Sequence, residues 1–256
     1  MYTSMRRWFY WESMVMDVYA FVANCSQCAR NRVGMRRKTN YLKTFPPKEP
    51  LTDLCMDLLG PLHSTAAGNE HLLVIVGRFS KMTRAIPLQR IDAEAIAAAF
   101  LDYWVAVYGP SATVLSDNDP QFRSTFFQGV CSLFWISNRY STTYHPHTNG
   151  QGERYNRNIV GQLWTYVQDH QYRWDELVSM LALAYNIRPQ KSTGVAPLEF
   201  VTPERVWSLS VERMVGVPTP EETNGSPRAI QEVIRTRLRN LIRKVRRSLT
   251  LAQRRY

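Results

Sequence analysis

Three short apolar segments in close succession constrain the fold of this chain more than any other feature of its sequence. They occupy residues 51–62, 71–79 and 83–88, and polar or Gly/Pro-containing turns separate them. Apolar runs of this length, bounded by turn residues, are typical of β-strands, and connections this short join antiparallel neighbours. The sequence therefore predicts three consecutive strands at the start of a sheet.

Helical and strand patterns alternate after these segments. A strand that is reached through a helix runs parallel to its neighbour, so this order predicts an α/β fold with a mixed five-stranded sheet flanked by helices. The elements predicted after the third strand are a helix over 93–108, a strand over 112–117, a helix over 124–135, a strand over 136–141, and helices over 151–169 and 173–187.

The first of these helices has clear start and stop signals. Asp92 can cap its N-terminus, and Gly109-Pro110 ends it. Apolar residues at helical spacing predict one buried face. That face would consist of Ile96, Phe100, Tyr103, Trp104 and Val107.

The net charge of +11 is concentrated at the two ends of the chain. Residues 1–48 carry +7 and residues 228–256 carry +9, which leaves −5 for residues 49–227. Basic ends could bind a polyanion through its phosphates, or they could be solvated tails, and charge alone leaves both readings open. A polyanion approaching the mildly acidic centre would need neutralising cations there.

Several protein classes are disfavoured by the apolar pattern. The longest apolar candidate, residues 93–107, is interrupted by Glu94 and Asp102, so no membrane-spanning segment and no membrane partner are expected. No secretory signal is visible in the first residues. The four cysteines are then most simply reduced thiols or metal ligands of an intracellular protein, with Cys55 and Cys131 in the core.

Three acidic residues could share a metal site. Asp57 lies inside an apolar strand, where an ionised group is costly unless it is neutralised, and Asp117 follows a second strand at its carboxyl end. Glu153 lies in the first turn of a helix. Taken singly, Asp117 could be a turn residue and Glu153 an acid favoured by the helix dipole. Brought together, three carboxylates would suit Mg²⁺ or Mn²⁺.

Five motifs across residues 54–200 resemble the catalytic core of retroviral-type integrases, specifically those of gypsy-type long-terminal-repeat retrotransposons. The acids Asp57, Asp117 and Glu153 fall within three of them, and 35 residues separate the second acid from the third, which is the spacing of the family's acidic triad. The motifs read MDLLGPL, RFSKMTRAIPL, VLSDNDPQF, STTYHPHTNGQGERYNR and AYNIRPQKSTGVAPLEFV.

This resemblance implies a ribonuclease H-like fold and a two-metal phosphodiester chemistry. Asp57, Asp117 and Glu153 would be the catalytic residues and would hold two Mg²⁺ or Mn²⁺ ions. The implied activity is DNA integration, in which the ends of a retroelement cDNA are processed and joined to target DNA. DNA is therefore the implied partner, a homo-oligomer the implied assembly, and the nucleus the implied compartment.

The resemblance also implies a division of the chain and a set of DNA-contacting residues. The expected parts are a partial N-terminal zinc-binding-type module over 1–33, a linker over 34–50, the catalytic core over 51–206, a linker over 207–227 and a basic amphipathic helix over 228–256. The residues expected to contact DNA are Tyr144, His145, His147, Arg154, Asn156, Arg157, Arg243, Lys244, Arg246 and Arg247. Zinc ligation by His145 and His147 is disfavoured, because Pro146 and the family pattern place them in a loop without cysteines.

The chain departs from the family pattern at some positions. Cys25 and Cys28 match the zinc module's cysteine pair, but no histidine precedes them, so zinc binding is doubtful. Gly77 stands where aspartate is usual. Other departures are Asn118, Asn149 and Gly152.

Two alternatives to an integrase remain open. One is a catalytically impaired, nucleic-acid-binding remnant of a retrotransposon polyprotein. The other is a ribonuclease H-type nuclease, which the spacing of the acids disfavours.

Overall fold

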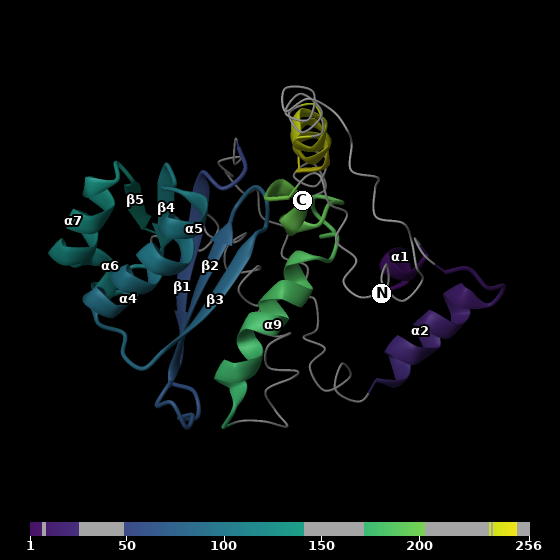
Figure 1. Cartoon of the computed structure of the whole chain (residues 1–256), viewed down its shortest axis with the longest axis horizontal. Coiled ribbons are helices and arrows are strands. Elements are labelled where there is room, and N and C mark those ends of the chain that lie inside the picture. Colours follow the sequence, from purple (N-terminus) through teal and green to yellow (C-terminus); the bar gives the residue numbers. More distant parts are fainter. Residues whose placement is uncertain (7–8, 26–48, 141–171, 203–235, 237, 250–256) are drawn as a thin grey trace, which may run out of the picture. The chain divides into compact units, whose positions relative to one another are not determined.

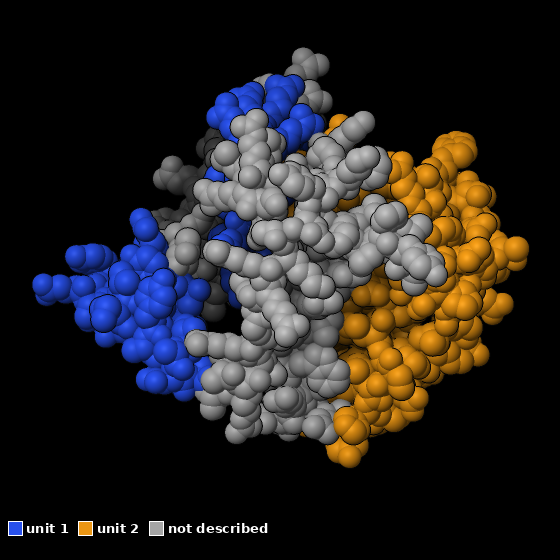
Figure 2. Space-filling model, turned by 180° about the vertical axis from the view of Figure 1, so that it is seen from behind, with its two compact units in different colours: residues 1–34, 186–255 blue, residues 35–185, 256 orange. Residues whose placement is uncertain are grey.

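The computed structural model describes residues 1–6, 9–25, 49–140, 172–202, 236 and 238–249. The chain divides into two compact units. One comprises residues 1–34 and 186–255, and the other comprises residues 35–185 with residue 256 (Figure 2). The second unit contains the sheet.

The sheet has five strands in the order β3-β2-β1-β4-β5 (Figure 1). β2 pairs antiparallel with both β1 and β3, whereas β4 pairs parallel with both β1 and β5. The predicted mixed sheet is therefore confirmed, including the antiparallel start and the parallel continuation. The strands are β1 (Asp53–Leu59), β2 (His71–Gly77), β3 (Thr83–Leu88), β4 (Thr113–Ser116) and β5 (Ser137–Tyr140).

Both faces of the central strands are covered, which explains their continuous apolar character. Within β2 every residue after His71 is buried. Successive side chains of a strand point to opposite faces, so a strand that is apolar throughout needs helices on both sides. Figure 1 shows α4 and α5 on one side of the sheet and α9 on the other.

The first face is covered by the helices that follow β3. Asp92 caps α4 by accepting a hydrogen bond from the Ala95 amide at 2.8 Å, and the Ser124 hydroxyl caps α7 by accepting one from the Phe127 amide at 3.1 Å. Gly109, at φ +84°, follows α5. The helices are α4 (Ala93–Phe100), the π-helix η1 (Leu101–Val105), α5 (Ala106–Tyr108), α6 (Pro120–Arg123) and α7 (Thr125–Leu133).

The predicted apolar face of the first helix is wrong at two positions. Tyr103 and Val107 are 51% and 53% exposed, whereas Trp104 is fully buried. The cause is the π-helical segment η1, whose wider turn shifts the residues after Phe100 around the helix axis. The inward face therefore continues from the buried Trp104 to the half-buried Tyr108, whose rings lie 4.9 Å apart, instead of through Tyr103 and Val107.

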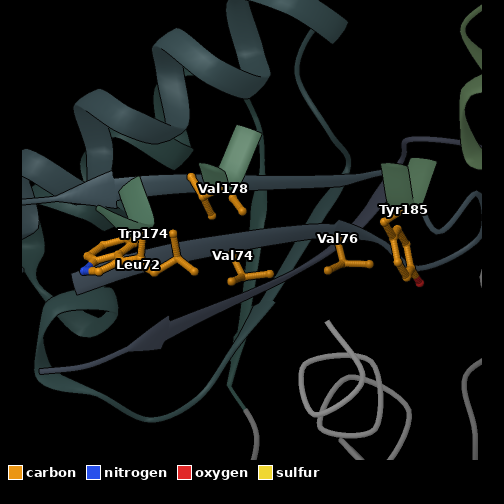
Figure 3. Close-up of a cluster of buried hydrophobic side chains, with 7 residues drawn as sticks. Leu72, Val74, Val76, Trp174, Val178 and Tyr185 are labelled. Carbon is orange, nitrogen blue, oxygen red and sulfur yellow. The ribbon is translucent and has the colours of Figure 1, made fainter. Parts of the chain in front are cut away.

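The second face of the sheet is covered by α9 (Trp174–Asn186). The residues of this helix that face the sheet recur at helical spacing, and those of β2 recur at strand spacing. Together they form one buried cluster (Figure 3). Its members are Leu72, Val74, Val76, Ala85, Trp174, Val178 and Tyr185.

The other unit contains short helices and the described part of the basic C-terminal segment. Its helices are α1 (Tyr2–Met5), α2 (Met14–Asn24) and the 3₁₀ helix η2 (Pro197–Phe200). Residues 238–249 are helical, as predicted, with Val245 fully buried. Among the described residues, no helix has the length and apolar character needed to cross a bilayer.

Candidate active site

The pairing of β1 with β4 brings two of the predicted acids together. Cys55 of β1 lies opposite Leu115 of β4 in a parallel ladder. Asp57 lies two residues beyond Cys55 on β1, and Asp117 lies two residues beyond Leu115 and directly follows the last residue of β4. The charge of Asp57 raises the pKa of Asp117, so the two carboxylates are close enough to interact. Parallel strands end at the same edge of a sheet, so the two carboxylates lie side by side there.

Register also decides on which face of the sheet Asp57 lies. Asp57 is paired with Val74 of the antiparallel neighbour β2. Directly paired residues point to the same face, and Val74 belongs to the cluster packed against α9. Asp57 therefore lies on the face of the sheet that α9 covers.

The Asp117 carboxyl has a pKa raised to about 6. Burial is the main cause, and the negative charges of Asp119 and Asp57 add to it. The Asp119 amide donates a long hydrogen bond of 3.4 Å to Asp117 Oδ1, which acts in the opposite direction. Ionising Asp117 at this site therefore costs free energy, and a nearby cation would remove that cost.

Asp119, whose charge raises the pKa of Asp117, was not among the site residues predicted from the sequence. It precedes Pro120, which begins α6, so it lies at the position before a helix. The signal that could have identified it is the alternation of Asp117 and Asp119 directly after a strand, since an acid two residues away is close enough to raise the pKa of its neighbour.

Asp57 is half-buried, and its Oδ1 accepts a hydrogen bond from the Leu58 amide at 3.1 Å. The buried Cys55 thiol, two residues earlier, is also affected by the negative charges of these acids. Burial raises its pKa to about 12, with Asp57 and Asp117 contributing in that direction. Cys55 therefore remains a protonated core thiol, as predicted, and so does Cys131, whose pKa burial raises to about 11.

The donor set at this edge fits a hard divalent cation. Asp57 and Asp117 offer carboxylate oxygens that are close enough to interact, and Mg²⁺ and Mn²⁺ prefer oxygen ligands. Within the described residues there is no group of three His, Cys, Asp or Glu side chains able to hold a metal. The predicted third ligand, Glu153, lies outside those residues.

Most of the other predicted site residues also lie outside the described part of the chain. Cys25, which follows α2, is half-buried, and its predicted partner Cys28 is outside. The remaining predicted DNA contacts outside the described residues are Tyr144, His145, His147, Arg154, Asn156 and Arg157. Their placement in a site therefore stays a prediction.

Four predicted DNA contacts on the C-terminal helix are described and are exposed. Arg243, Lys244, Arg246 and Arg247 surround the buried Val245. Arg243 donates a hydrogen bond of 3.5 Å to Asn240 on the same helix. A helix that is anchored by an apolar side chain and exposes several cations can contact the backbone of a nucleic acid.

A buried lysine lies in the turn that follows the strand end paired with the start of β1. Lys81, in the turn between β2 and β3, is fully buried, and its ammonium donates to the carbonyl of Arg78. Burial and the neighbouring Arg78 charge lower its pKa to about 7. Gly77, where the family usually has aspartate, could not carry a side chain without movement, because a Cβ there would meet Ser80 Oγ at 2.6 Å.

The N-terminal residues match a known family model. Residues 1–34 match the model described as the integrase zinc binding domain. This agrees with the resemblance seen around Cys25 and Cys28.

The curated relatives are retrotransposon polyproteins. The Tf2-3 and Tf2-4 transposon polyproteins of Schizosaccharomyces pombe (strain 972 / ATCC 24843) are each 29% identical over 197 residues, which is 76% of this chain. The chain spans 15% of the length of these relatives.

Among solved structures, a chain of the simian T-cell lymphotropic virus intasome, determined by cryo-EM in complex with PP2A regulatory subunit B56 gamma, superposes with a TM-score of 0.55. It is 18% identical, and the match covers 72% of this chain and 65% of that chain. At this identity the match concerns the fold, and it confirms the ribonuclease H-like architecture.

Proposed function

Because its sequence and fold resemble those of a retrotransposon integrase catalytic core, we propose that this chain is a metal-dependent polynucleotidyl transferase that processes retroelement cDNA ends and joins them to target DNA. The observation that carries the proposal is the proximity of Asp57 and Asp117 on the neighbouring strands β1 and β4, where the charge of Asp57 raises the pKa of Asp117. Two carboxylates forced together in this way favour divalent cation binding.

The proposed chemistry divides between three acids. Asp57 and Asp117 hold divalent cations from the sheet edge, and Glu153 completes the ligand set. Bound Mg²⁺ or Mn²⁺ would activate the attacking oxygen of water or of a DNA 3′-hydroxyl and would stabilise the leaving oxygen. Asp117 must lose its proton before it can ligate, so its raised pKa predicts that cation binding strengthens as the pH rises through about 6.

DNA would be held by basic and aromatic groups around this centre. The candidates next to Glu153 in the sequence are Tyr144, His145, His147, Arg154, Asn156 and Arg157. The exposed cations of the C-terminal helix, Arg243, Lys244, Arg246 and Arg247, add phosphate contacts. We expect these contacts to make DNA affinity fall steeply with salt.

The N-terminal module has only part of a zinc site in this sequence. The family-model match over residues 1–34 supports Cys25 and Cys28 as two ligands. A structural zinc ion needs four, and no histidine precedes this pair. Zinc binding would therefore require ligands from elsewhere. We also propose, from the resemblance, that the protein acts as a homo-oligomer in the nucleus.

The reversal of strand transfer on a branched DNA substrate with Mn²⁺ tests the proposal. It requires the three acids and asks least of the flanking modules. We expect activity from the purified chain and its loss in Asp117→Asn. Activity that is unchanged in this variant would contradict the proposed site.

A nucleic-acid-binding remnant is the second candidate function. Departures from the family pattern inside the chain, such as Gly77 where aspartate is usual, favour it, because a remnant could retain its acids after losing integration. This candidate predicts salt-dependent DNA binding without strand transfer in Mn²⁺. Cleavage of the RNA strand in an RNA–DNA hybrid would instead indicate a ribonuclease H-type nuclease.

A further inference from the structure

The first turn of α9 is hydrogen-bonded to the connection between β1 and β2. Asp175 Oδ2 accepts hydrogen bonds from Thr65 Oγ1 at 2.7 Å and from Asn69 Nδ2 at 2.9 Å. Next to it, Trp174 Nε1 donates to the His63 carbonyl at 2.8 Å. These three bonds link segments more than 100 residues apart in the sequence. We call them the α9 clamp.

The clamp is supported by buried apolar contacts at the end of β1. The Trp174 side chain is buried in the cluster that contains Leu72 and Val74 of β2 (Figure 3). Leu59, the last residue of β1, and Leu62, in the connection itself, pack against this cluster. The α9 clamp therefore holds both the connection and the strand end from which it departs.

The strand end held by the clamp is the one that carries Asp57. Leu59 pairs with Leu72, and Asp57, two residues earlier, pairs with Val74. Residues two apart in a strand share a face, so Asp57 emerges on the face that α9 covers. A shift of the connection would be transmitted to the position of the Asp57 carboxylate through Leu58 and Leu59.

The Asp175 carboxylate is well suited to act as an ionised anchor. Partial burial raises its pKa, but the hydrogen bonds from Asn69, Thr65 and nearby backbone amides outweigh this effect, and its pKa lies below the usual value. A charged acceptor forms stronger hydrogen bonds than a neutral one. The anchor is therefore in place at neutral pH and weakens only as the carboxylate is protonated in acid.

We propose that Asp175 is a positioning residue for the acidic site: by binding Thr65 and Asn69 it fixes the β1 end, so that Asp57 lies within cation-binding distance of Asp117. The inference rests on the proposed function, because it gives Asp57 and Asp117 a shared cation. The inference adds Asp175, a residue of α9, which would affect cation binding only through the position of β1.

The test compares loop protection with Mn²⁺ binding in Asp175→Asn. Hydrogen exchange measures the clamp itself, because the amides of Leu62, Thr65 and Gly68 donate within the connection to Glu70, Asn69 and Thr65 carbonyls at 2.7, 3.1 and 2.8 Å. We expect these amides to exchange at least about tenfold faster in the variant. Mn²⁺ affinity, measured from the signal of free Mn²⁺ in electron paramagnetic resonance, should fall about tenfold, as for other groups that orient a metal ligand.

Glu176→Gln is the matched control. Glu176 is the next residue on the same turn, is exposed and pairs with Arg173 at 2.6 Å. Within the described part of the chain, the carboxylate that binds Thr65 and Asn69 is that of Asp175 and not that of Glu176. Glu176→Gln removes one negative charge, as Asp175→Asn does, from the neighbouring residue. Exchange and Mn²⁺ affinity should both stay within about twofold of wild type, since an exposed ion pair contributes little.

A partner swap distinguishes positioning from direct action. In Asn69→Asp combined with Asp175→Asn, the amide at 175 can donate to the carboxylate at 69, so the bond is restored with reversed polarity. We expect the double variant to recover most of the exchange protection and Mn²⁺ affinity. Failure to recover affinity when protection returns would overturn the proposal, because residue 175 would then act on the cation by its own charge.

Two other outcomes are also decisive. Faster exchange in Asp175→Asn with unchanged Mn²⁺ affinity would reduce the clamp to a structural contact and overturn the inference while leaving the proposed function intact. Unchanged Mn²⁺ binding in Asp117→Asn would instead contradict the acidic site itself, and with it the inference. The two failures are therefore separable by one variant each.

Discussion

The two ends of the β1–β4 pair each place an acid of β1 beside a polar residue, with opposite consequences. At the start of the pair, Asp53 lies opposite Thr113, and the Thr113 hydroxyl donates to Asp53 Oδ1 at 2.5 Å. Four residues later, the same face of β1 carries Asp57, whose charge raises the pKa of Asp117 just after the end of β4. Asp53 accepts a hydrogen bond from a neutral hydroxyl, whereas Asp57 lies near a second carboxylate.

This difference separates a structural acid from a candidate metal ligand. Asp53 needs no ion, because its partner supplies a proton donor. At the other end, the carboxyl groups of Asp57 and Asp119 add to the raised pKa of Asp117. Position inside a strand is therefore a weak criterion for function, and the identity of the residue across the ladder is a strong one.

The largest expected difference between the two ends is in activity. Asp57→Asn should lower Mn²⁺-dependent reversal of strand transfer by about a thousandfold, which corresponds to the several kcal/mol that a bound metal contributes to a transition state. Asp53→Asn keeps an acceptor for Thr113 and should stay within about threefold of wild type. Equal losses of this activity in Asp57→Asn and Asp53→Asn, measured on one branched substrate, would contradict the distinction between a metal ligand and a structural acid.

Lys81 tests whether a shifted pKa alone marks a functional group. Its pKa in the folded chain, about 7, lies below the ordinary value of 10.5, so the unfolded chain binds more protons in that interval and stability rises with pH. Between pH 6 and pH 9 wild type should gain about 2 kcal/mol relative to Lys81→Met, by denaturant unfolding. Mn²⁺ affinity should not change. A pH-independent difference between the two proteins would contradict the buried-lysine interpretation.

Thr113→Val removes the donor at the structural end of the pair. Valine has nearly the same shape but leaves Asp53 Oδ1 without the hydroxyl, so unfolding free energy should fall by about 1.5 kcal/mol. Mn²⁺ affinity should be that of wild type. Weakened Mn²⁺ binding would show that the two ends are coupled along the strands.

Asp117→Asn should stabilise the metal-free protein slightly at neutral pH. The folded pKa of about 6 lies above the ordinary 3.8, so the stability present when the group is protonated is lost as the pH rises through 6. Asparagine resembles the protonated acid. After allowance for the exposure of this group, the variant should be more stable by roughly 1 kcal/mol at pH 7 and equal to wild type at pH 4. A destabilised variant at pH 7 would argue against repulsion at the site.

The strands and the adjacency of the two acids were predictable from the sequence, for local reasons. Apolar runs and turn residues mark β1, β2 and β3, and a helix before β4 implies a parallel pair with its neighbour. Once β4 lies beside β1, the ends of both strands must meet. The prediction about Asp57 and Asp117 therefore needed only element order.

The errors and omissions came from features that local patterns do not report. Tyr103 and Val107 fit a regular helix, but one π-helical turn moved them to the surface. Asp119 was overlooked because its effect on Asp117 depends on proximity in space as well as in sequence. The α9 clamp could not be predicted, since Thr65 and Asp175 are 110 residues apart.

By itself, the sequence determined which segments form strands and helices, which acids are candidates for a cation site, and which family the chain resembles, because each of these follows from periodicity, residue type and spacing. Only the tertiary structure decided which acids share a neighbour and which groups hold them in place. The physical reason is that electrostatic and hydrogen-bonding partners are set by distance between side chains, and folding brings residues such as Asp175 and Thr65 into contact without any mark in the intervening sequence.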